Sequence, residues 1–154
     1  MKFGDSFSFG QRLASVQRQF RAGIVVTLFC DFIQDPKFKW ILIVAAEREN
    51  PLFFIINTDE SPFAEHNANI KKQQLRLPKS VELFLDHDSW LDCSIVFDMF
   101  EIGEIEEALA KDMGLIKGFI SKATVEAVLD TIMDAESLSP RDITAISAEL
   151  SVLL

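Results

Sequence analysis

Three apolar segments separated by short turns constrain the fold of this chain more than any other feature. Residues 24–32, 40–46 and 52–57 are rich in Val, Ile, Leu and Phe, which favour β-strands. Residues 34–36 and 48–51 separate them, and each of these turns ends in a Pro, which fixes φ and restricts the residue before it. Strands joined by such short turns predict an antiparallel meander.

Two later segments also have strand character. Residues 73–77 alternate Leu75 and Leu77 with polar side chains, and residues 90–97 read as a closing strand. A polar loop over residues 58–69 comes before them. A sheet this small and this apolar is expected to curl into a barrel, because curling removes exposed strand edges.

Amphipathic segments predict helices on both sides of this barrel. Ser8 and Gln11 have capping-box spacing at the start of a helix that ends at Ala22-Gly23. Further helices are predicted over residues 101–112 and 122–138, and a last one starts at Ser139-Pro140, where Ser caps and Pro occupies the first turn. Residues 114–118 are expected to be a break between helices.

The expected fold is therefore α+β, a small and mainly antiparallel β-barrel with an added N-terminal helix and two to three C-terminal helices. A chain of 154 residues is the usual size of one domain. We expect residues 1–22 to form the N-terminal helix, residues 23–97 the barrel, and residues 98–154 a helical part.

Charge is distributed unevenly along the chain. Residues 1–80 contain 11 Lys and Arg against 8 Asp and Glu, a net charge of +3, whereas residues 81–154 contain 4 against 16, a net charge of −12. A protein with an overall formal charge of −9 is not an obvious nucleic-acid binder. Any RNA contact is therefore expected from the first half.

Several other classes of protein are not indicated. Residues 1–5 lack the apolar region of a signal peptide, and the best apolar run, residues 40–46, is far shorter than a membrane span. We therefore expect a cytoplasmic protein with no membrane contact. Cys30 and Cys93 lie in strand-like surroundings, where either a buried thiol or a disulfide would fit, and neither has a CxxC partner. No zinc site and no cofactor are expected.

The order of elements resembles that of the MazF/PemK-type toxins, which are metal-independent endoribonucleases built on a small SH3-like barrel. The likeness covers about residues 23–135. The segments that carry it are Gly23–Leu28, Lys39–Val44 and Phe54–Thr58, similar to the first three strands of the family, Asp88–Cys93, similar to a later strand that begins with Ser, and Gly118–Met133, similar to its terminal helix. The N-terminal helix and the helix after Pro140 are additions to that pattern.

The resemblance implies an SH3-like barrel, cleavage of single-stranded RNA, a homodimer, and an antitoxin protein as partner. One departure affects the chemistry. The family has an Arg-Pro pair at the start of the second strand, and this chain has Lys39-Trp40. Arg binds a phosphate with a bidentate fork, whereas Lys offers a point charge. Phosphate binding can survive this change, and cleavage is expected to be affected more.

RNA cleavage without a metal needs a base for the 2′-OH, a group that stabilises the charged phosphate, and an acid for the leaving oxygen. The candidate residues for these roles are Lys39, Thr58, His87, Asp88 and Ser89. Lys39 would stabilise charge, Thr58 would donate to a phosphate oxygen, and His87 is the natural acid–base group. Alternatively, Lys39 is a solvated side chain, Thr58 caps a strand end, and Asp88-Ser89 forms an Asx-type turn.

Basic and aromatic residues provide candidate RNA contacts. The basic candidates are Lys37, Lys71, Lys72, Arg76 and Lys79. Lysines on an edge strand also serve to prevent aggregation. Trp40 and Trp90 could stack on bases, although burial in the core is the commoner role of such residues.

Two functions of other classes compete with the ribonuclease. The first is a non-catalytic barrel module that binds a protein partner, having lost the Arg and gained an acidic half. The second is a nucleic-acid mimic or antitoxin that uses the half with net charge −12.

Overall fold

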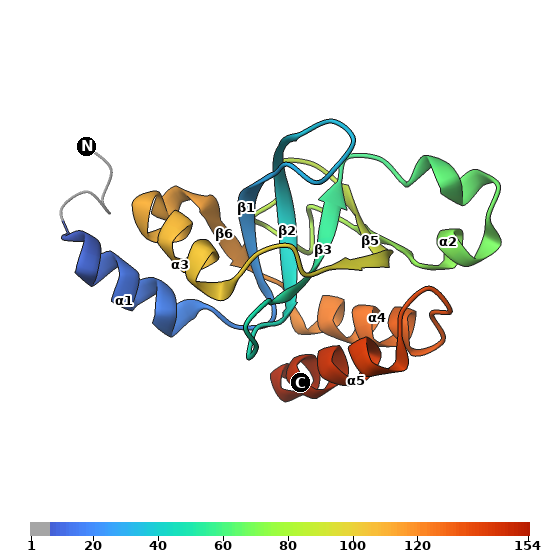
Figure 1. The fold of residues 1–154 in the computed structure, drawn as a ribbon. Helices are drawn as coiled ribbons and strands as arrows, with labels where there is room; N and C mark the ends of the chain where they lie inside the picture. Colours follow the sequence, from blue (N-terminus) through green and yellow to red (C-terminus); the bar gives the residue numbers. More distant parts are fainter. Residues whose placement is uncertain (1–6) are drawn as a thin grey trace.

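A computed structural model describes residues 7–154 (Figure 1). The segment 1–5, considered above for a signal peptide, lies outside these residues. Strands and helices follow one another in this order: α1 (Phe9–Gln19), β1 (Ile24–Cys30), β2 (Lys37–Ala45), β3 (Leu52–Asn57), α2 (Ala68–Lys72), β4 (Gln74–Leu77), β5 (Ser89–Phe97), α3 (Ile102–Lys111), β6 (Ile116–Phe119), α4 (Lys122–Met133) and α5 (Pro140–Leu150). Short 3-10 turns η2 (Pro62–Glu65), η3 (Met113–Leu115) and η4 (Ser151–Leu153) complete the described chain.

Within residues 7–154 the strands form one six-stranded sheet in the order β4-β5-β3-β2-β1-β6. Every neighbouring pair is antiparallel, and β1, β2 and β3 form the predicted meander. The sheet is curled into a half-barrel, which confirms the expected α+β fold with a mainly antiparallel, barrel-like sheet. It keeps two edges, β4 and β6, so full closure of the barrel was the wrong expectation.

The central strands are buried on both faces, which explains why the sheet does not need to close. Alternate residues of β1 belong to different cores: Val25 packs with α4 and α5, whereas Ile24 and Val26 pack with α1 and α3. Figure 1 shows these two helix pairs on either side of the sheet. Strands covered on both faces read as continuous apolar runs rather than alternating ones.

Local signals set the ends of the covering helices. Ser8 and Gln11 form the predicted capping box of α1, and Ser139 caps α5, which has Pro140 in its first turn. Gly23 follows α1 with φ +99°, and a Cβ there would lie 2.9 Å from Leu153 Cδ1. A side chain at this position would therefore be strained and crowded.

Two C-terminal expectations need correction. The predicted break over residues 114–118 overlaps β6, whose Gly118 pairs with Val25 of β1, so the sheet extends beyond the expected boundary at residue 97. The strand β6 has only four residues, and these include a Lys and a Gly, so its periodic pattern is too weak to predict a strand from the sequence. The helix expected over residues 122–138 ends at Met133, and the buried residues Ala135 and Leu138 follow it in a turn.

Two features of this fold shape a polar hollow. Pairing of β2 with β3 begins at Trp40, whereas pairing of β2 with β1 continues to Lys37. The hairpin therefore extends past the end of β3, and we call residues 28–30 and 37–39 the overhang. Opposite it runs the segment 78–88, which the buried Glu82 fastens to the start of α4 through Ser121 and Thr124.

Among residues 7–154, no helix combines the length and the apolar character that crossing a membrane requires.

Candidate functional site

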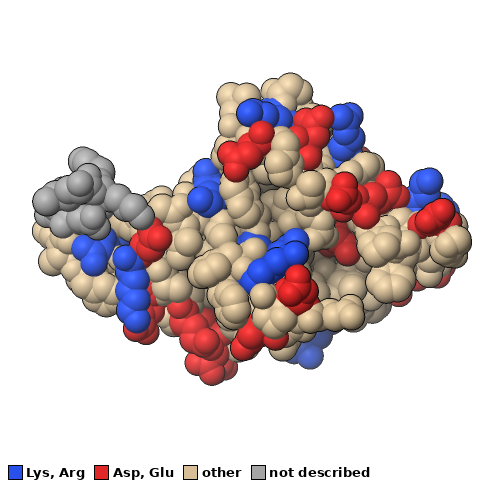
Figure 2. All heavy atoms as spheres, turned by 90° about the horizontal axis from the view of Figure 1, so that it is seen from above, with Lys and Arg blue, Asp and Glu red and all other residues tan. Residues whose placement is uncertain are grey.

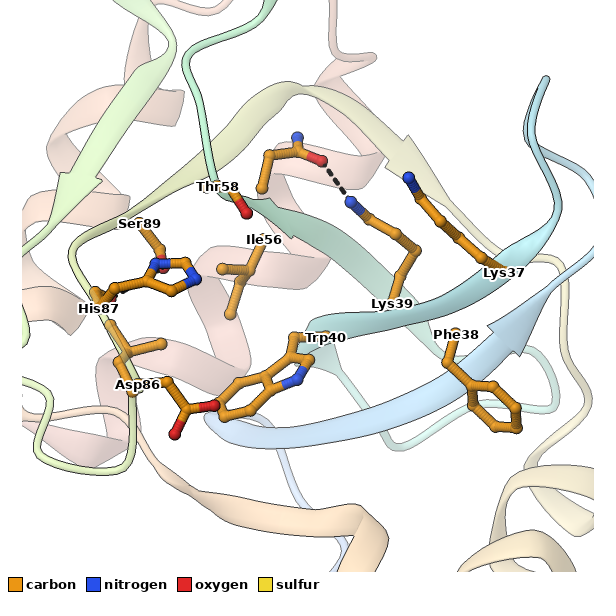
Figure 3. A pocket seen from close by; sticks show the side chains of 11 residues that line it. Lys37, Phe38, Lys39, Trp40, Ile56, Thr58, Asp86, His87 and Ser89 are labelled. Atoms are coloured by element: carbon orange, nitrogen blue, oxygen red, sulfur yellow. Dashed lines mark hydrogen bonds between the residues drawn. The ribbon is translucent and has the colours of Figure 1, made fainter.

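A pocket of about 250 Å³ lies between the overhang and the segment 78–88. We call it the overhang pocket, and Figure 3 shows the side chains that line it. Lys37 and Lys39 project to one side of β2 and Phe38 and Trp40 to the other, while the imidazole of His87 reaches in from the facing segment. The lining residues are Lys37, Phe38, Lys39, Trp40, Ile56, Asn57, Thr58, Leu85, Asp86, His87 and Ser89.

Four of the five catalytic candidates lie together in this pocket. Lys39 comes from β2, Thr58 follows β3, and His87 and Ser89 lie at the start of β5. Residues from three separate segments meet because the antiparallel order places the start of β2, the end of β3 and the start of β5 at one end of the sheet. Lys37, expected to contact RNA, lines the same pocket.

Lys39 is half-buried, and its ammonium group has a defined position. Its Nζ donates to Asn57 Oδ1 at 2.7 Å, the bond that is dashed in Figure 3. Burial lowers the pKa of Lys39, the positive charge of Lys37 lowers it further, and Cys30 opposes the shift. A cation that has lost part of its hydration interacts more strongly with an anion beside it.

The hydrogen bonds of His87 indicate which ring nitrogen carries the proton and which one can act as a base. Nδ1 lies 2.8 Å from the backbone oxygen of Asp88, which can only accept, so Nδ1 carries a proton. Ser89 Oγ donates to the carbonyl of His87 at 3.1 Å and lies 3.3 Å from Nδ1. In the neutral ring, Nε2 therefore has the free lone pair and can take up a proton.

Thr58 and Trp40 complete two walls of the pocket. Thr58 is exposed just after β3, so its hydroxyl can reach a ligand. Trp40 is half-buried and stacks on Phe84 with ring centroids 6.4 Å apart, and Lys117 Nζ lies 5.3 Å from its ring centroid. Trp40 is thus mainly a core residue with one edge in the pocket.

Asp88 is the catalytic candidate that lies outside the pocket. Its carboxylate binds Arg76 Nη2 at 2.8 Å and accepts from the backbone N–H of Lys79 at 2.9 Å. The bond from Lys79 lowers the pKa of Asp88, and Arg76 lowers it further. Asp88 therefore remains ionised and holds the turn before β5, which is close to the structural alternative considered above.

The other basic candidates do not line the overhang pocket. Lys71 and Lys72 are exposed on α2, Arg76 is paired with Asp88, and Lys79 Nζ donates to the carbonyl of Asp86. Figure 2 shows that, on the face seen from above, basic groups are scattered and most have acidic groups near them. The predicted basic stripe is thus not gathered around the catalytic candidates.

A second hollow, of about 470 Å³, shares a wall with the first. Lys37, Lys39, Asn57 and Thr58 line both. The remaining residues include three carboxylates, and we call this hollow the acidic hollow; its own lining residues are Asp59, Glu60, Ser61, Pro62 and Asp92. A phosphate would be attracted by the shared lysines and repelled by these carboxylates.

Sequence reasoning missed Asn57 and Phe38. Asn57 ends a strand, as polar residues often do, and only its pairing with Lys39 gives it a role. Phe38 follows a turn in a Phe-rich chain, and a strand pattern alone gives no sign that its ring is 60% exposed. The position of Phe38 between two lysines was the available signal.

Neither cysteine lines the overhang pocket. Cys30 and Cys93 are free, buried thiols, so the disulfide left open above is absent between them. No three His, Cys, Asp or Glu side chains within residues 7–154 are placed to share a metal ion.

Comparison of the chain with protein-family models, with curated proteins and with solved structures finds no match in any of the three.

Proposed function

We propose that this protein binds single-stranded RNA in the overhang pocket and cleaves it without a metal ion, as the MazF/PemK-type toxins do. One observation supports this most: Lys39, Thr58 and His87, which belong to three separate segments, line one pocket. Together they offer a cation, a hydroxyl donor and an acid–base group, the set that phosphodiester cleavage needs.

The proposed reaction is a transesterification that conserves all atoms. The ribose 2′-oxygen attacks the adjacent phosphorus, the bond from phosphorus to the 5′-oxygen breaks, and a 2′,3′-cyclic phosphate forms. His87 Nε2 takes the proton from the 2′-OH and then gives it to the leaving 5′-oxygen. The proton lost by one oxygen is gained by the other, so the step is balanced with His87 as both base and acid.

Lys39 and Thr58 would stabilise the negative charge that builds up on the non-bridging oxygens. The bond from Lys39 to Asn57 holds the ammonium in the wall of the pocket, so little reorganisation is needed when the charge develops. Lys offers one point charge in place of the bidentate fork of Arg. We therefore expect slower cleavage than an Arg at this position would give.

The wider biology proposed here follows the same resemblance. Such a ribonuclease would act in the cytoplasm as a homodimer and would be held inactive by an antitoxin protein. The helix α5, which is absent from the family pattern, is a candidate for contacts with either partner. Sedimentation or light scattering of the purified protein would test the dimer.

Incubation of the purified protein with a long RNA in excess chelator tests the proposed activity. We expect fragments that end in 2′,3′-cyclic phosphate. The variants Lys39→Met and His87→Ala should each cleave about 100-fold more slowly or worse, and Lys39→Arg should retain or exceed the wild-type rate. Lys111→Met is the matched control, because Lys111 is exposed on α3 and pairs there with Glu107.

The result that contradicts the ribonuclease is the absence of RNA fragments together with normal growth of cells that express the protein. That outcome would favour the second candidate, a non-catalytic module that binds a protein. The exposed carboxylates of α3, such as Glu104 and Glu107, support this alternative, because they suit a basic partner. If cleavage occurs and Lys39→Met leaves it unchanged, the assignment of Lys39 is wrong.

A further inference from the structure

Two phenylalanines form an exposed aromatic pair on the overhang. Phe29 of β1 and Phe38 of β2 lie directly opposite each other in the sheet register. Their ring centroids are 5.4 Å apart, with an angle of 68° between the ring planes. Phe29 is 48% exposed and Phe38 60% exposed, although the strands that continue from them are almost entirely buried. Folding alone gives no reason to present two large apolar rings to water at this place.

The pair stands next to the groups proposed to bind phosphate. Phe38 lines the overhang pocket with Lys39 and His87, and Lys37 and Lys39 flank it in the sequence. Trp40 projects to the same side of β2 (Figure 3), but its contacts with Phe84 and Lys117 occupy it. Phe38 is therefore the aromatic residue of this wall with a large part of its surface open to a ligand.

Charge favours the path of an RNA strand along this side. On leaving the overhang pocket through the acidic hollow, a strand would meet the carboxylates of Asp59, Glu60 and Asp92. Lys37 and Lys39 line both hollows, but the pocket that contains Phe38 adds a single carboxylate, Asp86, to them. A phosphodiester chain held at Lys39 is thus expected to continue toward the phenylalanine pair rather than away from it.

We propose that Phe38, supported edge-on by Phe29, is a stacking platform for an unpaired nucleobase next to the phosphate that Lys39 holds. This inference rests on the proposed function and adds to it a base-binding subsite. Every base has an apolar face, so the platform would accept all four. Double-stranded RNA, whose bases already stack on each other, would gain nothing from it.

Binding of an uncleavable RNA tests the platform separately from catalysis. The first probe is a fluorescein-labelled 12-nucleotide RNA of mixed sequence with 2′-O-methyl groups, and the second has the same backbone with every base removed. Polarisation would be measured with the wild type, Phe38→Ala and Phe38→Trp. Phe9→Ala is the matched control, because Phe9 is also a partly exposed ring, 40% exposed, and lies at the start of α1.

Phe38→Ala should bind the base-bearing probe about tenfold more weakly than the wild type, the usual loss when one stacking ring is removed. Phe38→Trp should bind it at least as tightly as the wild type, and Phe9→Ala should be unchanged. The probe without bases should bind weakly, and equally well to the wild type and to Phe38→Ala. This pattern assigns the effect of Phe38 to bases rather than to the backbone.

Two results would overturn the platform and leave the ribonuclease in place: equal binding of the base-bearing probe by wild type and Phe38→Ala, or equal binding of both probes by the wild type. Cleavage of ordinary RNA by the wild type would show that the proposed function stands in these cases. If the wild type binds neither probe and cleaves no RNA, the proposed function fails and the platform fails with it.

Discussion

Thr27 has a buried hydroxyl whose Oγ1 finds no hydrogen-bond partner among residues 7–154. The residue is 8% exposed in the middle of β1, opposite Trp40. A buried polar group without a partner loses its bonds to water and gains nothing in return. Thr124 makes a useful comparison, because it is equally buried but its hydroxyl donates to the carboxylate of Glu82.

The variant Thr27→Val should therefore be more stable than the wild type, by about 1 kcal/mol in the free energy of unfolding. Valine keeps the shape of threonine and favours strands. Thr124→Val should be destabilised by about as much, because it leaves an acceptor in Glu82 without one of its donors. Urea unfolding measures both, and a loss of stability in Thr27→Val would contradict this reading of β1.

Cys30 makes stability depend on pH. Burial raises the pKa of its thiol from 9.0 to about 11, with Lys39 opposing and Asp31 adding to the shift. Below pH 9 the thiol is neutral in both folded and unfolded chains. Between pH 9 and about 11 the unfolded chain loses this proton while the folded protein keeps it, so rising pH favours unfolding.

We therefore expect the urea midpoint, measured with reductant, to fall between pH 9.0 and about pH 11, and to fall less in Cys30→Ala. Ser94→Ala is the control, since it alters a buried side chain on β5 that has no thiol. Its midpoint should decrease with pH as steeply as that of the wild type. Equal pH dependence of Cys30→Ala and the wild type would show that the Cys30 thiol does not titrate in this way.

For individual residues, the sequence predicted which side chains line the pocket better than it predicted their contacts. The family resemblance and the chemistry of the side chains indicated Lys39, Thr58, His87 and Ser89, and these residues line one pocket. Asp88 was named with them because it is their neighbour in the chain, but a neighbour in a tight turn points elsewhere, and it binds Arg76. Pairs such as Lys39 and Asn57 depend on strand register, which local patterns do not specify.

Among the elements, the segment 78–88 has little regular structure and yet positions His87. Its anchor is Glu82, which is 2% exposed and accepts from the backbone N–H and the hydroxyl of Ser121 at the start of α4. A carboxylate at a helix N-terminus accepts hydrogen bonds from free N–H groups and interacts favourably with the positive end of the helix dipole. The anchor therefore joins the wall of the pocket to the helical layer.

Glu82→Ala should lower the free energy of unfolding by about 2 to 3 kcal/mol, because it leaves donors of Ser121 and Thr124 buried without an acceptor. Cleavage should decrease more than binding, because His87 loses its fixed position. Glu107→Ala is the control, an exposed carboxylate on α3 paired with Lys111, and it should change stability little. Equal stability of the two variants would mean that Glu82 is not an anchor.

Elements were predictable where a long periodic pattern or a cap marked them. N-caps and apolar stripes predicted α1, α4 and α5, and the continuous apolar runs predicted β1, β2 and β3. The strand β6 was missed because a strand of four residues depends on its neighbour: Gly118 admits a close approach, with Phe84 atoms 2.9 Å from where its Cβ would lie. The sequence also could not predict that β4 and β6 remain as edge strands, because this depends on how the helices cover both faces of the sheet.

For the whole molecule, the question is how a protein with a net charge of −9 can hold a polyanion. The carboxylates are concentrated in residues 81–154, and on the face shown in Figure 2 basic and acidic groups are interspersed. Attraction must then come from a few lysines close to the ligand rather than from the overall field, which is repulsive. The overhang pocket provides two, Lys37 and Lys39.

The salt dependence of RNA binding counts these charges. Each phosphate neutralised on a single strand contributes about −0.7 to the slope of log K against log salt, so two lysines predict a slope of about −1.4. If Lys71, Lys72, Arg76 and Lys79 also bound phosphates, six charges would give about −4. Polarisation of the 2′-O-methyl RNA across a salt series distinguishes these cases.

Lysine variants should distinguish the same two cases. Lys37→Ala should make the slope shallower by about 0.7, because one phosphate contact is lost. The double variant Lys71→Ala, Lys72→Ala should keep the wild-type slope, since both lysines lie on α2, outside the two hollows. A shallower slope in the double variant would instead extend the RNA path to α2, and an unchanged slope in Lys37→Ala would remove the overhang from it.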